Sequence, residues 1–442
     1  MKKIKKIFQY VLIGSMLLSF VPLHTAQAAG LVEDGELLTA AFWQNITPEG
    51  DVVLLQAAEK KRFNRQVVEK SSGMADLKTY PAKQAAGQIR SHVGDVTVLQ
   101  GTLYNANGEA MTATAKAGLA EKIDLEQLSG TKKMQLGIVV RRSNLRNLPT
   151  AEPLFSEPEY SMFDELQETA VDPSEPCVIL HTSRGGGYYY VQLYNYRGWL
   201  AAEDVAVVGD RKVWLQYVEP KNFLVVTDKS YNLSVADETI FYQMGSRLPL
   251  TKKAAARYGV RLPQRKADGN LAEKIVWIEK SPALREGYLP YTRNNLLQEA
   301  FCYLNEPYGW GGLKNSVDCS SFVENVYRTV GIVLPRNADE QETTAGQHFP
   351  LARLDAAGVC RSLHRNAKAG DTLHMDGHVM LYLGEAAGVP YAIHALGSHT
   401  EYYDDGAKER QKVLKVVVSD LELQTRSGAS FADALTAAVS FH

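Results

Sequence analysis

The order of secondary-structure patterns in the last third of the chain constrains the fold most. Apolar residues recur at helical spacing in "NNLLQEAFCYL" and in "CSSFVENVYRTV", and three apolar runs follow: "AGDTLHM", "GHVMLYLG" and "PYAIHALG". A period of 3.6 predicts amphipathic helices, and short apolar runs bounded by turn residues predict strands. Because the helices come first and the strands follow as a block, the region predicts an antiparallel α+β domain, which we place at 283–442, rather than a parallel sheet.

Two stretches upstream carry short alternating runs separated by Pro, Gly and Asn. The first extends from "MQLGIVVRRSNL" to "NYRGWLAAEDVAVV", and the second from "NFLVVTDKSYNL" to "KIVWIEK". Several short strands with turn signals between them are typical of small β-barrels. We predict two such barrels in tandem, at 136–212 and at 213–282.

The beginning of the chain differs from the rest. "MKKIKKIF" carries four lysines, a short apolar run follows, and "AQAAG" offers a small-residue cleavage site ending at Ala28. These features predict an export signal at 1–28, since the apolar run is too short to span a bilayer comfortably. An uncleaved anchor is the alternative. Residues 29–135 are alanine-rich and mostly helical in pattern, without a cluster of catalytic groups, and we interpret them as a packing segment.

Composition limits the classes of function. The chain has 442 residues, 45% of them hydrophobic and 22% charged, and a formal net charge of −2. This composition is typical of globular domains, and the mildly acidic balance gives no electrostatic reason to expect nucleic acid as a partner. We expect an exported protein of the periplasm, cell wall or medium, without a stable membrane anchor, acting as a monomer.

The four cysteines are too few for a disulfide scaffold in so long a chain. No C-x-x-C pair is present, and the Cys and His spacings do not suggest a zinc site, so we expect neither a metal nor another cofactor. Cys177, in "EPCVIL", is predicted to be a buried strand residue. Cys302 and Cys360 are the one pair that we consider for a disulfide.

Cys319 has the setting of a nucleophile. It follows Asp318, a plausible helix boundary, and an apolar stripe continues behind it at Phe322, Val323, Val326, Tyr327 and Val330. On a first helical turn, free backbone N–H groups favour a thiolate and can stabilise an oxyanion on an attacked carbonyl.

A thiol nucleophile also needs a base and a group that orients the base. His378 heads an apolar strand 59 residues after the cysteine, and His394 lies 16 residues further, on the next strand. If the strands form a hairpin, the two imidazoles can face the same way, with His378 as base and His394 fixing its tautomer. A histidine on a half-buried strand is more often structural, and there are four competitors: His348, His364, His374 and His399.

These motifs resemble a known family. "YGWGGLKNSVDCSSFVENVYRTVGIVLPRNADEQ", followed by "GHVMLYLG" and "YAIHA", is similar to the NlpC/P60 cysteine peptidases. The resemblance implies a papain-like α+β fold and cleavage of peptidoglycan stem peptides between γ-D-glutamate and diaminopimelate or lysine. Carried over by motif, the catalytic residues are Cys319, His378 and His394. The residues implied to bind substrate are Tyr308, Asp318 and Ser320.

The resemblance extends upstream. The two barrel-like regions are similar to paired bacterial SH3 (SH3b) domains of a multi-domain subgroup, and 29–135 stands where that subgroup has a stabilising segment. In such relatives the first barrel narrows the cleft and selects short peptides with a free N-terminal L-Ala. Two positions depart from the family pattern: Ala338, where many relatives carry Ser, and His374, at a commonly apolar position.

Three hypotheses of function remain at this point. The first is a cell-wall endopeptidase that acts through an acyl-enzyme. The second is a non-catalytic wall-binding protein with SH3b anchors, and the third is an acyltransferase that uses the same cysteine. Asp318 has two roles open to it, helix cap and partner of a substrate ammonium. The "GWGG" glycines lack a P-loop lysine and do not predict a phosphate site.

Overall fold

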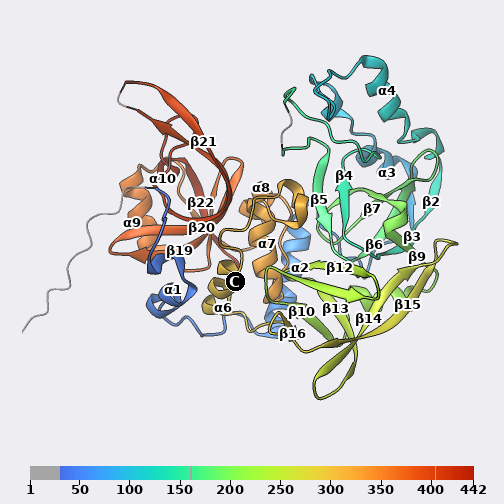
Figure 1. Cartoon of the computed structure of the whole chain (residues 1–442), viewed down its shortest axis with the longest axis horizontal. Helices are drawn as coiled ribbons and strands as arrows, with labels where there is room; N and C mark the ends of the chain where they lie inside the picture. Colours follow the sequence, from blue (N-terminus) through green and yellow to red (C-terminus); the bar gives the residue numbers. More distant parts are fainter. Residues whose placement is uncertain (1–29, 160–161, 404) are drawn as a thin grey trace, which may run out of the picture.

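The computed structural model of the chain describes residues 30–159, 162–403 and 405–442. The predicted export signal at 1–28 therefore lies outside the described residues. In Figure 1 the C-terminal domain lies on the left, the first barrel at the upper right and a second β unit at the lower right, with α7 between them. Among the described residues, no helix is long and apolar enough to cross a membrane.

The N-terminal segment wraps around two of the other parts. Its main elements are α1 (Ala40–Ile46), α2 (Ala57–Lys70), β1 (Lys83–Ala85), α3 (Ala86–Val93), α4 (Ala113–Glu121) and β2 (Thr131–Lys133). Trp43 of α1 and Phe63 of α2 are buried in the core of the C-terminal domain, whereas Ile89 of α3 and Leu119 of α4 pack into the core of the first barrel. The segment thus ties these two parts together.

The first barrel is a seven-stranded antiparallel sheet in the order β5-β4-β8-β7-β6-β3-β9. Its strands are β3 (Gln135–Val139), β4 (Ser143–Arg146), β5 (Gln167–Val171), β6 (Pro176–Thr182), β7 (Tyr188–Gln192), β8 (Arg197–Ala201) and β9 (Val205–Val208). Cys177 is fully buried on β6, as predicted.

A second β unit follows the helix α5 (Arg211–Val218). Five strands pair in the order β15-β14-β13-β10-β16, and β11 and β12 form a separate hairpin. The bounds are β10 (Phe223–Val226), β11 (Ser230–Val235), β12 (Glu238–Gln243), β13 (Arg247–Lys253), β14 (Arg257–Arg265), β15 (Leu271–Glu279) and β16 (Leu284–Glu286). The unit has its own apolar core, which includes Leu224, Tyr242 and Val260.

The C-terminal domain contains a six-stranded antiparallel sheet in the order β17-β22-β18-β19-β20-β21, which confirms the predicted α+β class. Its helices are α6 (Arg293–Phe301), α7 (Cys319–Thr329), α8 (Ala338–Thr343), α9 (Ala356–Asn366) and α10 (Phe431–Ala434). Its strands are β17 (Gln347–Pro350), β18 (Thr372–Met375), β19 (His378–Ala386), β20 (Val389–Tyr402), β21 (Lys408–Asp420) and β22 (Leu435–Ser440). Thr292 caps α6 by accepting the N–H of Asn295.

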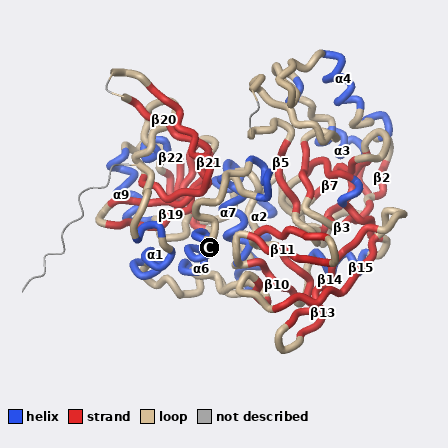
Figure 2. Tube along the Cα trace, in the orientation of Figure 1, coloured by secondary structure: helices blue, strands red, loops and turns tan. Residues whose placement is uncertain are grey.

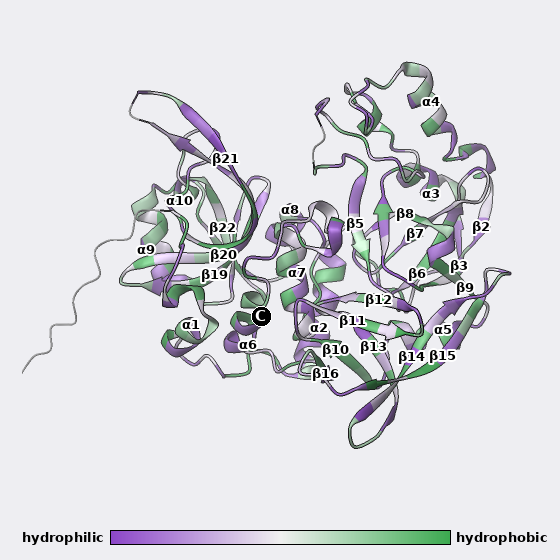
Figure 3. Cartoon of the chain, viewed as in Figure 1, coloured by the Kyte–Doolittle hydropathy of each residue, from purple (hydrophilic) through white to green (hydrophobic). Residues whose placement is uncertain are grey.

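The sheet of the C-terminal domain has a separate apolar layer on each face. Helices α6 and α7 pack on one face, and α9 and α10 pack on the other. Figure 2 shows the three groups of strands around the central helices α2 and α7, and Figure 3 shows the hydrophilic far end of the β20–β21 hairpin, which projects away from the sheet.

The disulfide considered between Cys302 and Cys360 does not form, because both thiols are free. Cys302 lies at the end of α6 and packs with the layer on one face of the sheet. Cys360 belongs to α9, which covers the opposite face. A disulfide needs Cα atoms within about 7 Å of each other, and the sheet stands between these two.

Candidate active site

Cys319 is the first residue of α7, and local sequence explains why the helix begins there. The Asp318 carboxylate accepts the N–H of Ser321 at 2.9 Å, and the Ser321 hydroxyl accepts the N–H of Asp318 at 3.0 Å. This reciprocal cap confirms the predicted helix boundary. The apolar stripe behind it is buried in the core, which leaves Cys319 partly exposed on the first turn.

The two predicted histidines meet. β19 and β20 form an antiparallel pair, and Nε2 of His378 lies 2.8 Å from Nδ1 of His394. His394 is fully buried, and its Nε2 lies 2.9 Å from the hydroxyl of Ser419 on β21. The predicted hairpin and its shared imidazole face are therefore confirmed. Ser419 was not found from the sequence, since only the pairing of β20 with β21 places it there.

Three of the competing histidines have partners of their own. His374 is buried on β18 with Nε2 2.8 Å from the Thr372 hydroxyl, and burial lowers its pKa to about 3. His364 binds the carboxylate of Glu385, and His348 binds the carbonyl oxygen of Thr344. His378 and His394 are thus set apart by their contact with each other.

Burial dominates the electrostatics of the site. It raises the pKa of the Cys319 thiol to about 12, an effect that the Asp318 charge increases and that the N–H groups of Val379 and Ser320 oppose. Burial also lowers the pKa of His378 to about 4. The helix N-terminus therefore favours the thiolate as expected, but desolvation is the larger effect, and the resting thiol and imidazole are both neutral. Since Val379 directly follows His378, the thiol lies beside the start of β19.

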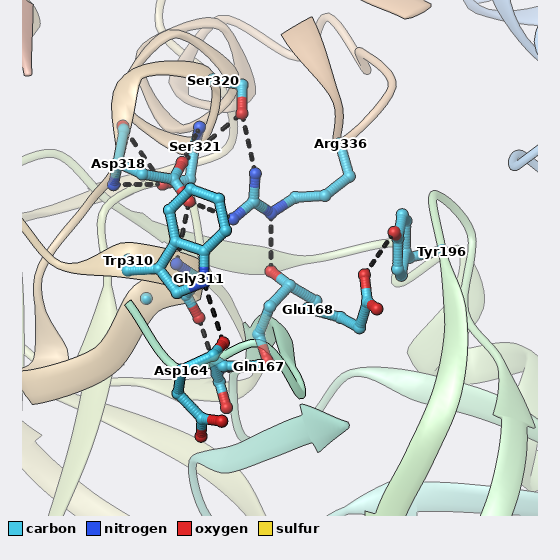
Figure 4. A network of polar contacts seen from close by, with 12 residues as sticks. Asp164, Gln167, Glu168, Tyr196, Trp310, Gly311, Asp318, Ser320, Ser321 and Arg336 are labelled. Atoms are coloured by element: carbon cyan, nitrogen blue, oxygen red, sulfur yellow. Dashed lines mark hydrogen bonds and ion pairs between the residues drawn. The ribbon is translucent and has the colours of Figure 1, made fainter. Parts of the chain in front are cut away.

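Asp318 is saturated by contacts within the protein (Figure 4). One oxygen accepts from Ser321 and Ser320, and the other accepts from the N–H of Gly311 at 3.0 Å and from Arg336 at 2.5 Å. A carboxylate has about four lone-pair sites, and all are in use. The capping role predicted for Asp318 is present, and Ser320 is engaged as well, because its hydroxyl accepts from Arg336 at 2.8 Å.

The glycines of "GWGG" lie where the first barrel touches the C-terminal domain. Gly311 and Gly312 belong to the turn η5 (Trp310–Asn315), which Gly309 directly precedes, and Gln167 of β5 donates to the carbonyl oxygen of Gly311 at 2.8 Å. A Cβ on Gly311 would stand 2.6 Å from Gln167, and one on Gly312 would stand 2.7 Å from Ala170. The turn therefore carries no side chains there because β5 lies directly against it.

Tyr308 is buried just before this turn and forms a parallel bridge with Val317. Burial raises the pKa of its phenol, and the nearby Cys319 and Asp318 charges raise it further. The ring of Phe163, from the first barrel, lies 6.1 Å from that of Tyr308 and 5.4 Å from that of Trp310. Tyr308 thus lies near Cys319, under an aromatic side chain of the barrel.

A polar pocket of about 300 Å³ lies where the N-terminal segment, the first barrel and the C-terminal domain meet. Glu168 of β5 and Tyr196 line it, and the Tyr196 hydroxyl donates to Glu168 at 2.6 Å. No ion pair among the described residues involves Glu168. The other lining residues are Ser72, Gly73, Ser91, His92, Asp95, Asn147, Tyr190, Arg197, Gly198, Asn337 and Glu340.

The tyrosine-rich stretch of the first barrel does more than pack. No residue of this stretch, "GGGYYYVQLYNYRGW", is among the site residues predicted from the sequence. In the structure, the Tyr194 hydroxyl donates to Glu324 of α7 at 2.6 Å, and Tyr196 lines the pocket. Their role depends on the docking of two domains, which no local pattern reveals.

Comparison with known proteins decides the domain types. Residues 305–412 match the NlpC/P60 family, and residues 153–201 match an SH3 domain of the SH3b1 type. The chain therefore contains an NlpC/P60 domain. That domain carries Cys319, His378 and His394, and the SH3 match lies within the first barrel. The assignment of 213–282 as a second SH3b domain stays a prediction.

The curated relatives match part of the chain. The γ-D-glutamyl-L-lysine dipeptidyl-peptidase of Bacillus subtilis (strain 168) is 28% identical over 109 residues, which are 24% of this chain and 35% of the relative. Dipeptidyl-peptidase 6 of Lysinibacillus sphaericus is 34% identical over 94 residues, 21% of this chain and 30% of the relative. The match thus spans about a third of each relative's length.

A solved structure shares the wider architecture. The NlpC/P60 endopeptidase from Photobacterium damselae subsp. piscicida superimposes with a TM-score of 0.73, covering 89% of this chain and 94% of that structure at 16% identity. At this identity the likeness shows the fold. Within the described ranges, no group of three or more His, Cys, Asp or Glu side chains is arranged to hold a metal ion.

Proposed function

We propose that this chain is an exported cysteine endopeptidase that hydrolyses the γ-D-glutamyl–diamino acid bond of peptidoglycan stem peptides. The observation that carries the proposal is the chain of contacts from His378 through His394 to Ser419, beside Cys319 on the first turn of α7. The NlpC/P60 domain supports a peptidase of this class, and the name of the Bacillus subtilis relative supports the substrate.

The histidine chain sets the tautomer that a base requires. If His394 donates from Nε2 to the Ser419 hydroxyl, its Nδ1 is free to accept the Nε2–H of His378. The Nδ1 lone pair of His378 then remains to take the proton of the Cys319 thiol. The opposite tautomer would leave a proton on that nitrogen and no base.

In the proposed reaction, the Cys319 sulfur attacks the γ-carbonyl carbon while His378 accepts the thiol proton. N–H groups of the first turn of α7 stabilise the oxyanion, and the C–N bond breaks as His378 returns the proton to the amine of the diamino acid. A water molecule, deprotonated by His378, then hydrolyses the thioester. Transfer of the proton during attack suits a pair whose resting forms are both neutral.

The pocket beside Glu168 is proposed to hold the free amino group of an N-terminal L-Ala. Asp318 was the acidic partner predicted from the sequence, but its oxygens are occupied. Glu168 is partly exposed in the pocket, without an ionic partner among the described residues. A buried or half-buried carboxylate attracts an ammonium through a charge-assisted hydrogen bond. We therefore propose that the enzyme acts on released peptides with a free N-terminus.

The test uses L-Ala-γ-D-Glu-diaminopimelate and L-Ala-γ-D-Glu-L-Lys, each with a free and with an acylated N-terminus, and identifies products by mass spectrometry. We expect the dipeptide and the free diamino acid from the unblocked peptides only. Glu168→Gln should raise KM for the free peptides, whereas the exposed Glu165→Gln is the matched control. Equal cleavage of blocked peptides would contradict the role of Glu168. Transfer of the dipeptide to an added amine would favour an acyltransferase, and absence of any product would favour a wall-binding protein.

A further inference from the structure

One side chain connects the first barrel to the nucleophile helix. Each of the three nitrogens of the Arg336 guanidinium has a different partner (Figure 4). Nη2 donates to the Asp318 carboxylate at 2.5 Å, and Nη1 donates to the Ser320 hydroxyl at 2.8 Å. Nε donates to the hydroxyl of Thr169 at 2.8 Å. The first two partners flank Cys319, and the third belongs to β5 of the barrel.

The network is shielded from water. Arg336, Asp318 and Thr169 are 3%, 5% and 7% exposed, respectively. A buried guanidinium holds its geometry only when its donors are satisfied, since an unsatisfied buried donor is costly. The Thr169 hydroxyl is the acceptor for Nε of Arg336. Among the described contacts, no residue of the NlpC/P60 domain accepts from this nitrogen.

Thr169 itself is fixed by the barrel. β5 pairs with β4, and Thr169 stands opposite Leu145 in that ladder. The side chain of Gln167 donates both to the Thr169 carbonyl oxygen at 3.0 Å and to the Gly311 carbonyl oxygen at 2.8 Å. The position of the guanidinium is thus set from the barrel side, by a strand that is locked against η5.

The charge of Arg336 matters at the nucleophile. Asp318 directly precedes Cys319, and an unpaired carboxylate there would oppose the formation of a thiolate. Arg336 acts in the opposite direction: its charge lowers the pKa of the thiol, while Asp318 raises it. Holding the guanidinium against Asp318 therefore favours ionisation of Cys319.

We propose that Arg336 and Thr169 are positioning residues, through which the docked first barrel aligns and neutralises Asp318 beside the nucleophile. The barrel is then part of the catalytic apparatus and more than a wall of the cleft. The inference rests on the proposed role of Cys319 as nucleophile.

The test compares Thr169→Val, which removes the hydroxyl at constant shape, with Thr169→Ser, which keeps it. We expect Thr169→Val to lower kcat about tenfold, to change KM less than about twofold and to slow alkylation of Cys319 at pH 8 about tenfold, with the pH profile of alkylation moved to higher pH. Thr169→Ser should restore all three readouts. The control is Thr251→Val in β13, where the hydroxyl donates to the Gly259 carbonyl oxygen.

A Thr169→Val protein with the kcat and alkylation profile of wild type would overturn the proposal. If Thr169→Val does not fold, Arg336→Lys takes its place, with a slowed alkylation expected and an unchanged profile overturning the proposal. Alkylation is followed by peptide mapping of Cys319 and needs no substrate. A wild type that fails to cleave stem peptides would therefore contradict the proposed function and leave the alkylation comparison intact.

Discussion

At the residue scale, the site depends on neutral forms of ionisable groups. Burial lowers the pKa of His394 as it does that of His378, and it raises the pKa of Cys319. Neither Cys319 nor His378, the proposed nucleophile and base, is therefore charged before substrate binds. In the proposed mechanism, the contacts from His378 through His394 to Ser419 orient the base, and the proton moves only when the sulfur attacks.

The pH dependence of activity tests whether His378 is neutral at rest. Because the pKa of His378 is about 4, its imidazole stays unprotonated well below the ordinary histidine value of about 6.5. We expect kcat/KM on a stem tripeptide to persist below pH 6 and to fall as the pH approaches about 4. Steady-state rates across this range are the measurement, and an acid limb near pH 6.5 would contradict it.

Ser419 provides a second prediction at this scale. Ser419→Ala leaves the buried Nε2 of His394 without its partner, so the required tautomer of His378 loses its support. We expect kcat to fall roughly tenfold while KM changes little, the effect of about one hydrogen bond. Ser398→Ala, at a serine of β20 that binds Arg410, is the control. Equal rates in both variants would show that Ser419 has no part in orienting His394.

At the scale of elements, the contact between β5 and η5 explains why the motif "GWGG" has glycine at 311 and 312. Gly311 and Gly312 have φ values of +54° and +77°, and barrel side chains occupy the space where their Cβ atoms would be. The glycines thus fix how closely the barrel approaches η5, the turn that precedes α7.

Gly311→Ala is expected to destabilise the protein by collision with Gln167 as well as by backbone strain. Gly186, in the turn between β6 and β7, also has a positive φ of +76° but open space around it. We predict that Gly311→Ala lowers the free energy of unfolding by about 1–3 kcal/mol more than Gly186→Ala does. Denaturant titration measures both, and the double variant Gly311→Ala/Gln167→Ala should recover part of the difference. Equal losses for the two glycines would refute the close approach.

Sequence patterns were informative wherever the signal is local. The cap at Asp318, the start of α7 and the β19–β20 hairpin could be predicted because each depends on neighbours within one or two elements. Arg336, Ser419 and Glu168 could not, because their partners are distant in sequence and belong to other strands or another domain. The capping role of Asp318 depends on its own helix and could be predicted. Its ion pair with Arg336 depends on a residue outside that helix and could not be predicted.

At the scale of the whole molecule, the parts converge on α7. The N-terminal segment packs into both the first barrel and the NlpC/P60 domain, and Arg328 of α7 forms ion pairs with Glu175 and Asp172 of the barrel side. Interfaces held by buried polar contacts respond to pH and depend on every partner being present.

Buried histidines make the folded state sensitive to acid. His374 has a pKa of about 3 in the folded protein, against about 6.5 when unfolded, so between these values the unfolded chain binds a proton that the folded one does not. Stability is therefore lost as the pH falls from about 6.5 towards 3. We expect His374→Leu to reduce the drop in Tm between pH 7 and pH 5, whereas His364→Leu, at an exposed position, is the control. An unchanged drop in His374→Leu would contradict this account.

Capture of the acyl-enzyme would show whether Cys319 is the nucleophile. Wild type and Cys319→Ala are mixed with L-Ala-γ-D-Glu-diaminopimelate, quenched in acid within the first turnovers, and examined by peptide mapping and mass spectrometry. We expect an adduct of the L-Ala-γ-D-Glu dipeptide on Cys319 in wild type, and neither an adduct nor free diaminopimelate with Cys319→Ala. Release of diaminopimelate by Cys319→Ala at the wild-type rate would contradict it.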